Sequence, residues 1–243
     1  MHQKHNFSEK YLNKVLSKAK KRSSTINKYR KPKKNIAEQK KDWKWYKGIF
    51  INANNIANGK LFIKHYKKEL KRAQKKYGVP AEYIASIIGI ETKYGKYLGK
   101  ELVLNSLSSL AFHDRKRSKF FTNELRNFFL MTRDKKSKVH KIKGSYAGAM
   151  GYGQFMPSSY MKYAVDFNKD GKKDLWDKVD SIGSIANYLN KKGWKKNSYV
   201  IKSSTENGRR GHNFKIIKTY NNSNRYAKVV HLLAQRIKQA LKK

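Results

Sequence analysis

The sequence of 243 residues contains no cysteine. This absence excludes disulfide bonds, thiolate metal sites, a cysteine nucleophile and a lipid anchor on an N-terminal cysteine. The sequence also lacks any apolar run near the roughly 18 residues that a transmembrane helix requires, so we expect no membrane-spanning helix. Residues 1–24 are charged throughout and have no apolar core, and we expect no secretory signal peptide there.

Acidic residues are also few: 16 Asp and Glu stand against 58 Lys and Arg, which gives a formal net charge of +42. This excess indicates either compositional drift with a general affinity for anions, or a dedicated polyanionic partner such as nucleic acid, anionic lipid or cell wall. Arginine accounts for only 11 of the 58 basic residues. Because proteins that read DNA bases depend on arginine forks, we expect no specific nucleic-acid partner.

Hydrophobic periodicity predicts a mainly helical chain of the α+β class. Residues 1–40 are basic and polar, and we interpret them as a solvated N-terminal arm with one short helix around Leu12, Val15 and Leu16. Packed structure is expected from Trp43 onward. Helices are predicted over residues 59–77, 80–94, 102–112, 118–133, 158–165, 179–192 and 225–241, and the best strand candidates lie within 199–219, around 199–201 and 214–217.

Glu91 occupies a position on a helix face where a hydrophobic residue is normally found. Ile84, Ile87 and Ile88 form the apolar face of the helix that begins near Pro80, and Glu91 is the next residue along that face. A carboxyl group at such a position loses hydration, which raises its pKa and favours the protonated form. This is the property of a general acid. The alternative is a glutamate at a frayed helix end that reaches solvent or pairs with nearby lysines.

The segment 144–157, GSYAGAMGYGQFMP, contains four glycines, two tyrosines and a glutamine. Glycines let a backbone approach a ligand closely, although a flexible loop with a tight turn is the alternative. Together with residues 91–95 (ETKYG) and 220–223 (YNNS), this segment resembles the membrane-bound lytic murein transglycosylase B family. The similarity extends from about residue 46 to the C-terminus and is densest between residues 77 and 194.

The resemblance implies a lysozyme-like fold and cleavage of the β-1,4 bond between N-acetylmuramic acid and N-acetylglucosamine in peptidoglycan, without water as a reactant. Glu91 matches the family's single catalytic glutamate. It would protonate the leaving oxygen and then accept the proton of the muramic acid C6 hydroxyl, which closes a 1,6-anhydro ring. One carboxylate suffices for this reaction, whereas hydrolytic glycosidases use two. Asp114 is the nearest sequence candidate for a second carboxylate, but the resemblance gives it no role.

Further positions match sugar-contacting positions of the family. The tyrosines would offer stacking faces and the polar side chains hydrogen bonds. These positions are Tyr46, Lys116, Arg117, Ser145, Gln154, Tyr188, Tyr220, Asn221 and Tyr226. Lys116 departs from the family, which has a pair of arginines here, because lysine keeps the charge but loses the planar fork.

An acidic loop lies at residues 166–180 of this basic chain and holds five of its 16 acidic residues. Its start, DFNKDGK, matches the first positions of an EF-hand calcium loop, with oxygen-bearing side chains at positions one, three and five and glycine at six. We expect a structural Ca²⁺ ion. Its expected ligands are Asp166, Asn168, Asp170, Asp180 and the carbonyl of Lys172. The alternative is an Asx-turn satisfied by local backbone bonds.

The resemblance also implies a catalytic core over residues 81–195, with the calcium loop inside it, and a helical accessory subdomain built from 41–80 and 196–243. It implies a monomer in the periplasm or cell envelope, with peptidoglycan glycan strands as partner and cell-wall synthesis proteins as further candidates. Residues 197–220 form a shorter stretch than in typical members, which insert a small β-rich subdomain there. This departure leaves a peptidoglycan-binding scaffold without activity as an alternative. The high positive charge leaves a basic nucleic-acid-binding protein as another.

Overall fold

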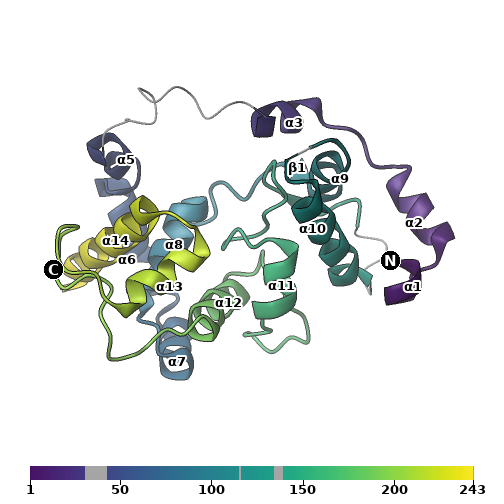
Figure 1. Ribbon diagram of the computed structural model, residues 1–243. Coiled ribbons are helices and arrows are strands. Elements are labelled where there is room, and N and C mark those ends of the chain that lie inside the picture. The colour runs from purple at the N-terminus through teal and green to yellow at the C-terminus, as the bar shows by residue number, and fades with distance from the viewer. Residues whose placement is uncertain (31–42, 115, 134–138, 243) are drawn as a thin grey trace. The chain divides into compact units, whose positions relative to one another are not determined.

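The computed structural model describes residues 1–30, 43–114, 116–133 and 139–242. Almost all of its regular structure is helical, which confirms the predicted mainly helical fold class (Figure 1). Across these described residues, no helix is both long enough and apolar enough to cross a membrane.

The described residues divide into two compact units. Unit 1 contains residues 1–30, 98–114, 116–133 and 139–162, and unit 2 contains residues 43–97 and 163–242. These boundaries do not coincide with the expected subdomain limits near residues 80 and 195. The expected division into a core and an accessory subdomain stays a prediction.

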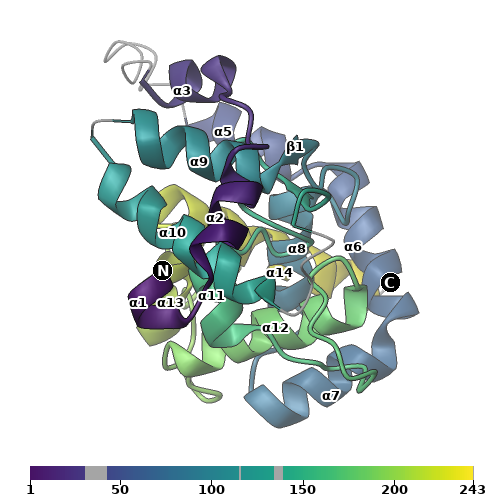
Figure 2. The same cartoon turned by 90° about the vertical axis from the view of Figure 1, so that its right-hand side faces the viewer.

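Unit 1 is organised around α9 and α10, which pack against each other and lie side by side in both views (Figures 1 and 2). A two-residue antiparallel ladder of β1 and β2 joins the start of α9 to the glycine-rich segment. The elements are α1 (His2–His5), α2 (Glu9–Leu16), α3 (Ser23–Arg30), β1 (Glu101–Leu102), α9 (Val103–His113), α10 (Ser118–Met131), β2 (Lys143–Gly144) and α11 (Pro157–Tyr163), which ends at the boundary with unit 2.

The N-terminal segment differs from the expected solvated arm wherever it is described. The short helix is present as α2, but Phe7, Val15 and Ile26 are buried in unit 1. The backbone N–H of Lys20 donates a hydrogen bond of 3.0 Å to Asn105 Oδ1, across 85 positions of sequence. The prediction failed because apolar residues are sparse in this polar and basic segment, and its packing partners lie far along the chain. Residues 31–40 of the expected arm lie outside the described residues.

Unit 2 is built on α14, which packs along α8 and α6 (Figure 2). The carboxyl-terminal helix therefore forms the centre of this unit, with Val229, Val230 and Leu233 fully buried. The elements are α5 (Trp43–Phe50), α6 (Ala53–His65), α7 (Lys67–Tyr77), α8 (Ala81–Thr92), α12 (Lys178–Lys191), α13 (His212–Tyr220) and α14 (Asn224–Lys242).

Two local predictions in unit 2 are wrong. The helix expected over 59–77 is two helices that meet at Tyr66, and the first starts earlier because the Asn52 side chain caps it. The strand expected around 214–217 is the helix α13, whose Phe214 and Ile217 are buried three residues apart on one face. The other strand candidate, around 199–201, contributes one isolated antiparallel bridge, from Ile201 to Arg210.

The helix that carries Glu91 was predicted correctly. α8 follows Pro80, and Ile84, Ile87 and Ile88 are fully buried. Burial of each such side chain contributes roughly 1.5–3 kcal/mol, which fixes the rotation of the helix about its axis. That rotation determines where Glu91, one turn further along, must point.

Candidate active site

Glu91 lies in the last turn of α8; part of the residue is exposed, whereas protein atoms crowd its carboxyl group and exclude water from it. The hydroxyl of Tyr226, from α14, donates a hydrogen bond of 2.7 Å to Glu91 Oε1. Burial raises the pKa of Glu91 from its ordinary value of 4.5 to about 7, and the bond from Tyr226 opposes part of that rise. No carboxylate among the described residues contributes to the shift. The carboxyl group is therefore divided between its protonated and ionised forms near neutral pH.

The backbone that follows Glu91 is held in an unusual conformation. Lys93 and Tyr94 both have positive φ, at 48° and 58°, which ends the helix within one residue. The Tyr94 ring folds back over α8, and its hydroxyl donates to the carbonyl of Asn55 at 3.1 Å. A Cβ at Gly89 would come within 2.5 Å of that hydroxyl, so only glycine leaves room for the ring. Tyr94 thus connects the Glu91 turn to α6.

Tyrosine rings surround this carboxyl group within unit 2. The Tyr220 ring stacks nearly parallel to that of Tyr226, with centroids 6.3 Å apart. Tyr188 meets Tyr220 edge-on at 4.8 Å and donates its hydroxyl to the carbonyl of Thr219 at 2.6 Å. Burial, and then the charge of Glu91, raise the pKa of Tyr220 well above its ordinary value. These hydroxyls stay neutral at physiological pH. Tyr188 and Tyr226 are buried, so Tyr220 is the ring of these three that keeps a partly exposed apolar face of the kind that suits sugar rings.

Tyr46 reaches the same region from α5. Burial is the first cause of its raised pKa, and the negative charge of Glu91 is the second. Glu206 anchors this helix: it accepts hydrogen bonds from Trp43 Nε1 at 2.7 Å and from Lys47 Nζ at 3.0 Å. The bond from Trp43 is the main reason that the pKa of Glu206 falls to about 2. The sequence pattern did not indicate Glu206, since its partners lie about 160 positions away.

Asn221 completes the predicted residues of unit 2. It is exposed and directly follows α13, next to Tyr220. Its amide is therefore available to a ligand at the edge of the tyrosine cluster.

The predicted residues of unit 1 include two in the glycine-rich segment. Ser145 Oγ accepts hydrogen bonds from the backbone N–H groups of Ala147 and Ala149, at 3.3 and 3.0 Å. Its hydroxyl proton remains available for donation. Gln154 has a positive φ of 48° and donates Nε2 to the Gly151 carbonyl at 2.9 Å. A non-glycine residue held in this conformation is typical of ligand-binding turns.

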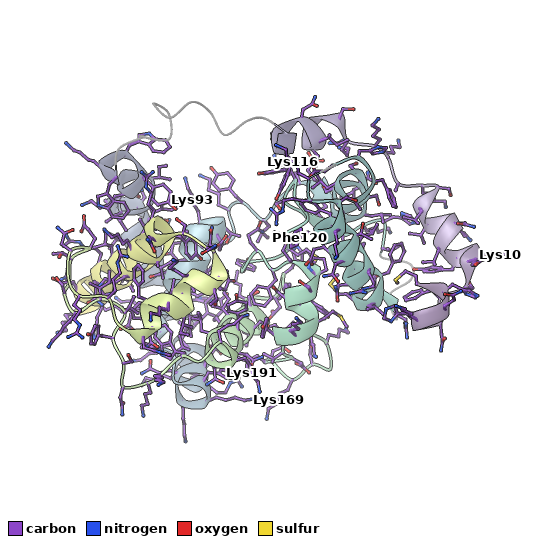
Figure 3. All side chains as sticks on the ribbon, in the orientation of Figure 1. Lys10, Lys93, Lys116, Phe120, Lys169 and Lys191 are labelled. Carbon is purple, nitrogen blue, oxygen red and sulfur yellow. The ribbon has the colours of Figure 1, made fainter. Side chains whose placement is uncertain are left out.

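Lys116 and Arg117 also belong to unit 1 and are both exposed, directly before α10. Figure 3 labels Lys116 and also Phe120, whose ring lies 4.3 Å from the Arg117 guanidinium carbon. Lys10, Lys169 and Lys191 project outward from other elements in the same view, which illustrates how the positive charge is spread over both units.

The acidic loop forms local hydrogen bonds. Asp166 accepts from the backbone N–H groups of Asp170 and Gly171, at 3.1 and 2.8 Å. Asp180 is buried, and its carboxylate accepts from three backbone N–H groups. No group of three or more His, Cys, Asp or Glu in the described parts of the chain lies close enough together to hold a metal ion. The oxygen donors of Asp166, Asn168 and Asp170 nevertheless share one turn, and this donor type fits a hard cation such as Ca²⁺.

Comparison with known proteins places this geometry in a family. A model described as the transglycosylase SLT domain matches residues 1–210. The chain is 44% identical over 202 residues to the membrane-bound lytic murein transglycosylase B of Escherichia coli (strain K12), which covers 81% of this chain and 56% of that protein. The chain thus spans little more than half the length of this relative.

Solved structures agree with this match. The Escherichia coli lytic transglycosylase Slt35 in complex with calcium is 36% identical and superimposes with a TM-score of 0.89, over 100% of this chain and 91% of that one. The soluble lytic transglycosylase SltB1 from Pseudomonas aeruginosa is 33% identical, with a TM-score of 0.91 over 100% of this chain and 97% of that one. The chain therefore belongs to the transglycosylase SLT domain family of lytic murein transglycosylases.

Proposed function

We propose that the protein is a peptidoglycan lytic transglycosylase in which Glu91 acts alone as acid and base. The observation that carries the proposal is the environment of Glu91: a carboxyl group with a pKa of about 7, bonded to Tyr226 and shifted by burial without a second carboxylate. A hydrolytic glycosidase would need a partner carboxylate, as nucleophile or as base for water. Family membership supports the same reaction type.

The reaction needs two proton transfers at one group. Protonated Glu91 donates to the oxygen that links N-acetylmuramic acid to N-acetylglucosamine, and the bond from C1 to that oxygen breaks. The C6 hydroxyl of the muramic acid then forms a bond to C1 and gives its proton to the Glu91 carboxylate. The product is a 1,6-anhydro end, and Glu91 returns to its starting state.

The remaining residues would bind the glycan strand. Tyr46, Tyr188, Tyr220 and Tyr226 would stack on sugar rings or hold Glu91 in place, while Asn221 would donate hydrogen bonds. Ser145, Gln154, Lys116 and Arg117 would contact other parts of the strand, the last two through charge.

Calcium would stabilise the fold without entering the chemistry. Asp166, Asn168, Asp170 and the Lys172 carbonyl would supply oxygen ligands, with Asp180 as the last member of the set. The structure of Slt35 in complex with calcium supports this proposal by relationship.

The proposed substrate implies that the protein works in the periplasm or cell envelope. Cell-wall synthesis proteins are candidate partners there. We propose that the protein works as a monomer, without a specific nucleic-acid partner.

Mass spectrometry of the fragments released from purified sacculi tests the reaction. The wild-type protein should release 1,6-anhydromuramic ends, and Glu91→Gln should release none while still folding. Reducing ends would mean a hydrolytic lysozyme. Binding to sacculi without any product would mean a scaffold that lacks activity.

A further inference from the structure

Arg117 lies in unit 1 with aromatic rings on several sides. Its guanidinium carbon is 4.3 Å from the centroid of the Phe120 ring, and 5.6 Å from those of Phe121 and Tyr29. Stacking of this kind orients a guanidinium group and leaves its edge free to donate hydrogen bonds. Among the described residues, no Asp or Glu forms an ion pair with Arg117. Aromatic rings therefore hold this exposed cation, and no described carboxylate oxygen lies within ion-pair distance of it.

Tyr29 is the one of these rings that also fixes the direction of the guanidinium. Its hydroxyl accepts a hydrogen bond of 2.5 Å from Arg117 Nη1, across 88 positions of sequence. Its ring packs edge-on against Phe121 at 5.0 Å, which holds the tyrosine itself in place. The donors at Nη2 and Nε have no partner among the described residues.

The N-terminal helix α3 adds a second charge beside this group. Lys28 Nζ lies 5.3 Å from the centroid of the Tyr146 ring, and that ring lies 6.4 Å from the ring of Tyr29. Tyr146 directly follows Ser145 in the glycine-rich segment and is 42% exposed. Lys28, Arg117, the half-buried ring of Tyr29 and the exposed ring of Tyr146 thus form one continuous patch on unit 1.

We propose that Tyr29 is a positioning residue that aims the free donors of Arg117 at a carboxylate of the substrate. The inference rests on the proposed function, in which Arg117 contacts the glycan strand, and it adds the chemical group that is recognised. A guanidinium edge with two parallel donors matches a carboxylate. In peptidoglycan, carboxylates are carried by the peptides attached to the muramic acid, so the patch would recognise peptide-bearing strands.

The test compares Tyr29→Phe with the wild-type protein on soluble glycan strands that carry peptides, and on the same strands after their peptide carboxylates have been converted to neutral amides. The substitution keeps the ring against Phe121 and removes only the acceptor. We expect KM for peptide-bearing strands to rise about three- to tenfold, with kcat within about twofold. KM for the amidated strands and the melting temperature should stay unchanged. Tyr199→Phe, at an exposed tyrosine of unit 2, is the matched control and should change nothing.

A double variant separates positioning from a direct contact. If Tyr29 acts through Arg117, adding Tyr29→Phe to Arg117→Ala should cause no further loss. Additive losses in the double variant, equal losses on amidated strands, or an unchanged KM for strands with free carboxylates would each overturn the proposal. Sedimentation of the same variants with strands measures affinity without turnover. A wild-type protein that binds but forms no anhydro ends would contradict the proposed function, while a Tyr29-dependent preference for strands with free peptide carboxylates would still support the positioning role.

Discussion

Replacing Glu91 by glutamine should make the protein more stable at alkaline pH even as it removes activity. Burial raises the pKa of Glu91 from 4.5 to about 7, so ionisation of this group destabilises the folded protein. The interval between these two values, at about 1.4 kcal/mol per pH unit, amounts to about 3 kcal/mol. Glutamine keeps the shape and carries no charge, so the variant avoids this cost.

The sign follows from proton binding. Between pH 4.5 and about 7 the folded state holds a proton on Glu91 that the unfolded state has lost. The free energy of unfolding of the wild-type protein therefore falls as pH rises through this window, and the contribution of Glu91 is constant above it. The variant lacks this fall, so the difference in stability between variant and wild type should grow by about 3 kcal/mol from low to high pH.

Urea unfolding followed by tryptophan fluorescence measures this difference. All four tryptophans, Trp43, Trp45, Trp176 and Trp194, lie in unit 2, so the signal reports the unit that carries Glu91. Measurements at about pH 5 and about pH 8 span most of this window, so most of the difference of about 3 kcal/mol should appear between them. A wild type and variant with parallel pH dependence would refute the assignment of a raised pKa to Glu91.

Glu206→Gln is the control of opposite sign. The pKa of Glu206 is lowered to about 2, so its stabilisation is present above the ordinary value of 4.5 and is lost only as pH falls through about 2. This variant should be destabilised to the same extent at both pH values. A pH-dependent difference there would show that other groups dominate the signal.

Three further outcomes follow from the same contacts. Tyr226→Phe removes the hydrogen bond that lowers the pKa of Glu91, so the alkaline limb of the pH–rate profile should move to higher pH; an unmoved limb would separate that limb from Glu91. Gly89→Ala forces the Tyr94 ring away and should cost about 1–3 kcal/mol in urea unfolding, with a lower kcat; unchanged stability would contradict the close contact. Calcium at 100 times its Kd should add about 2.7 kcal/mol of stability, measured as a higher melting temperature, and Asp166→Asn should lose most of that gain.

Local sequence patterns were sufficient to predict α8, the helix that carries Glu91. The spacing of Ile84, Ile87 and Ile88 and the proline before them predicted both the helix and the face on which Glu91 lies. Such a prediction succeeds because the responsible interactions are within one or two turns. The raised pKa of Glu91 also followed from this placement alone.

Interactions between distant segments could not be predicted in this way. The helix α13 was expected as a strand because its isoleucines favour strands, and packing in the fold overrode that preference. Gly59 was expected to begin a helix, yet it lies inside α6, where a Cβ would clash with Ile237 and Tyr94. Glu206 and Tyr29 carried no signal at all, because each acts through a partner that only the fold brings near.

The pKa of about 7 explains why one glutamate is enough for the proposed reaction. A group that donates a proton in one step and accepts one in the next works best when neither form is strongly favoured at the working pH. Burial alone would hold Glu91 protonated and make it a poor base, whereas the hydroxyl of Tyr226 stabilises the ionised form and brings the pKa back toward neutrality. Because Tyr226 is itself buried and its pKa is raised well above the ordinary value, it remains a neutral donor throughout. The balance between burial and this single bond, and not the carboxyl group by itself, sets the capacity of Glu91 to serve in both steps.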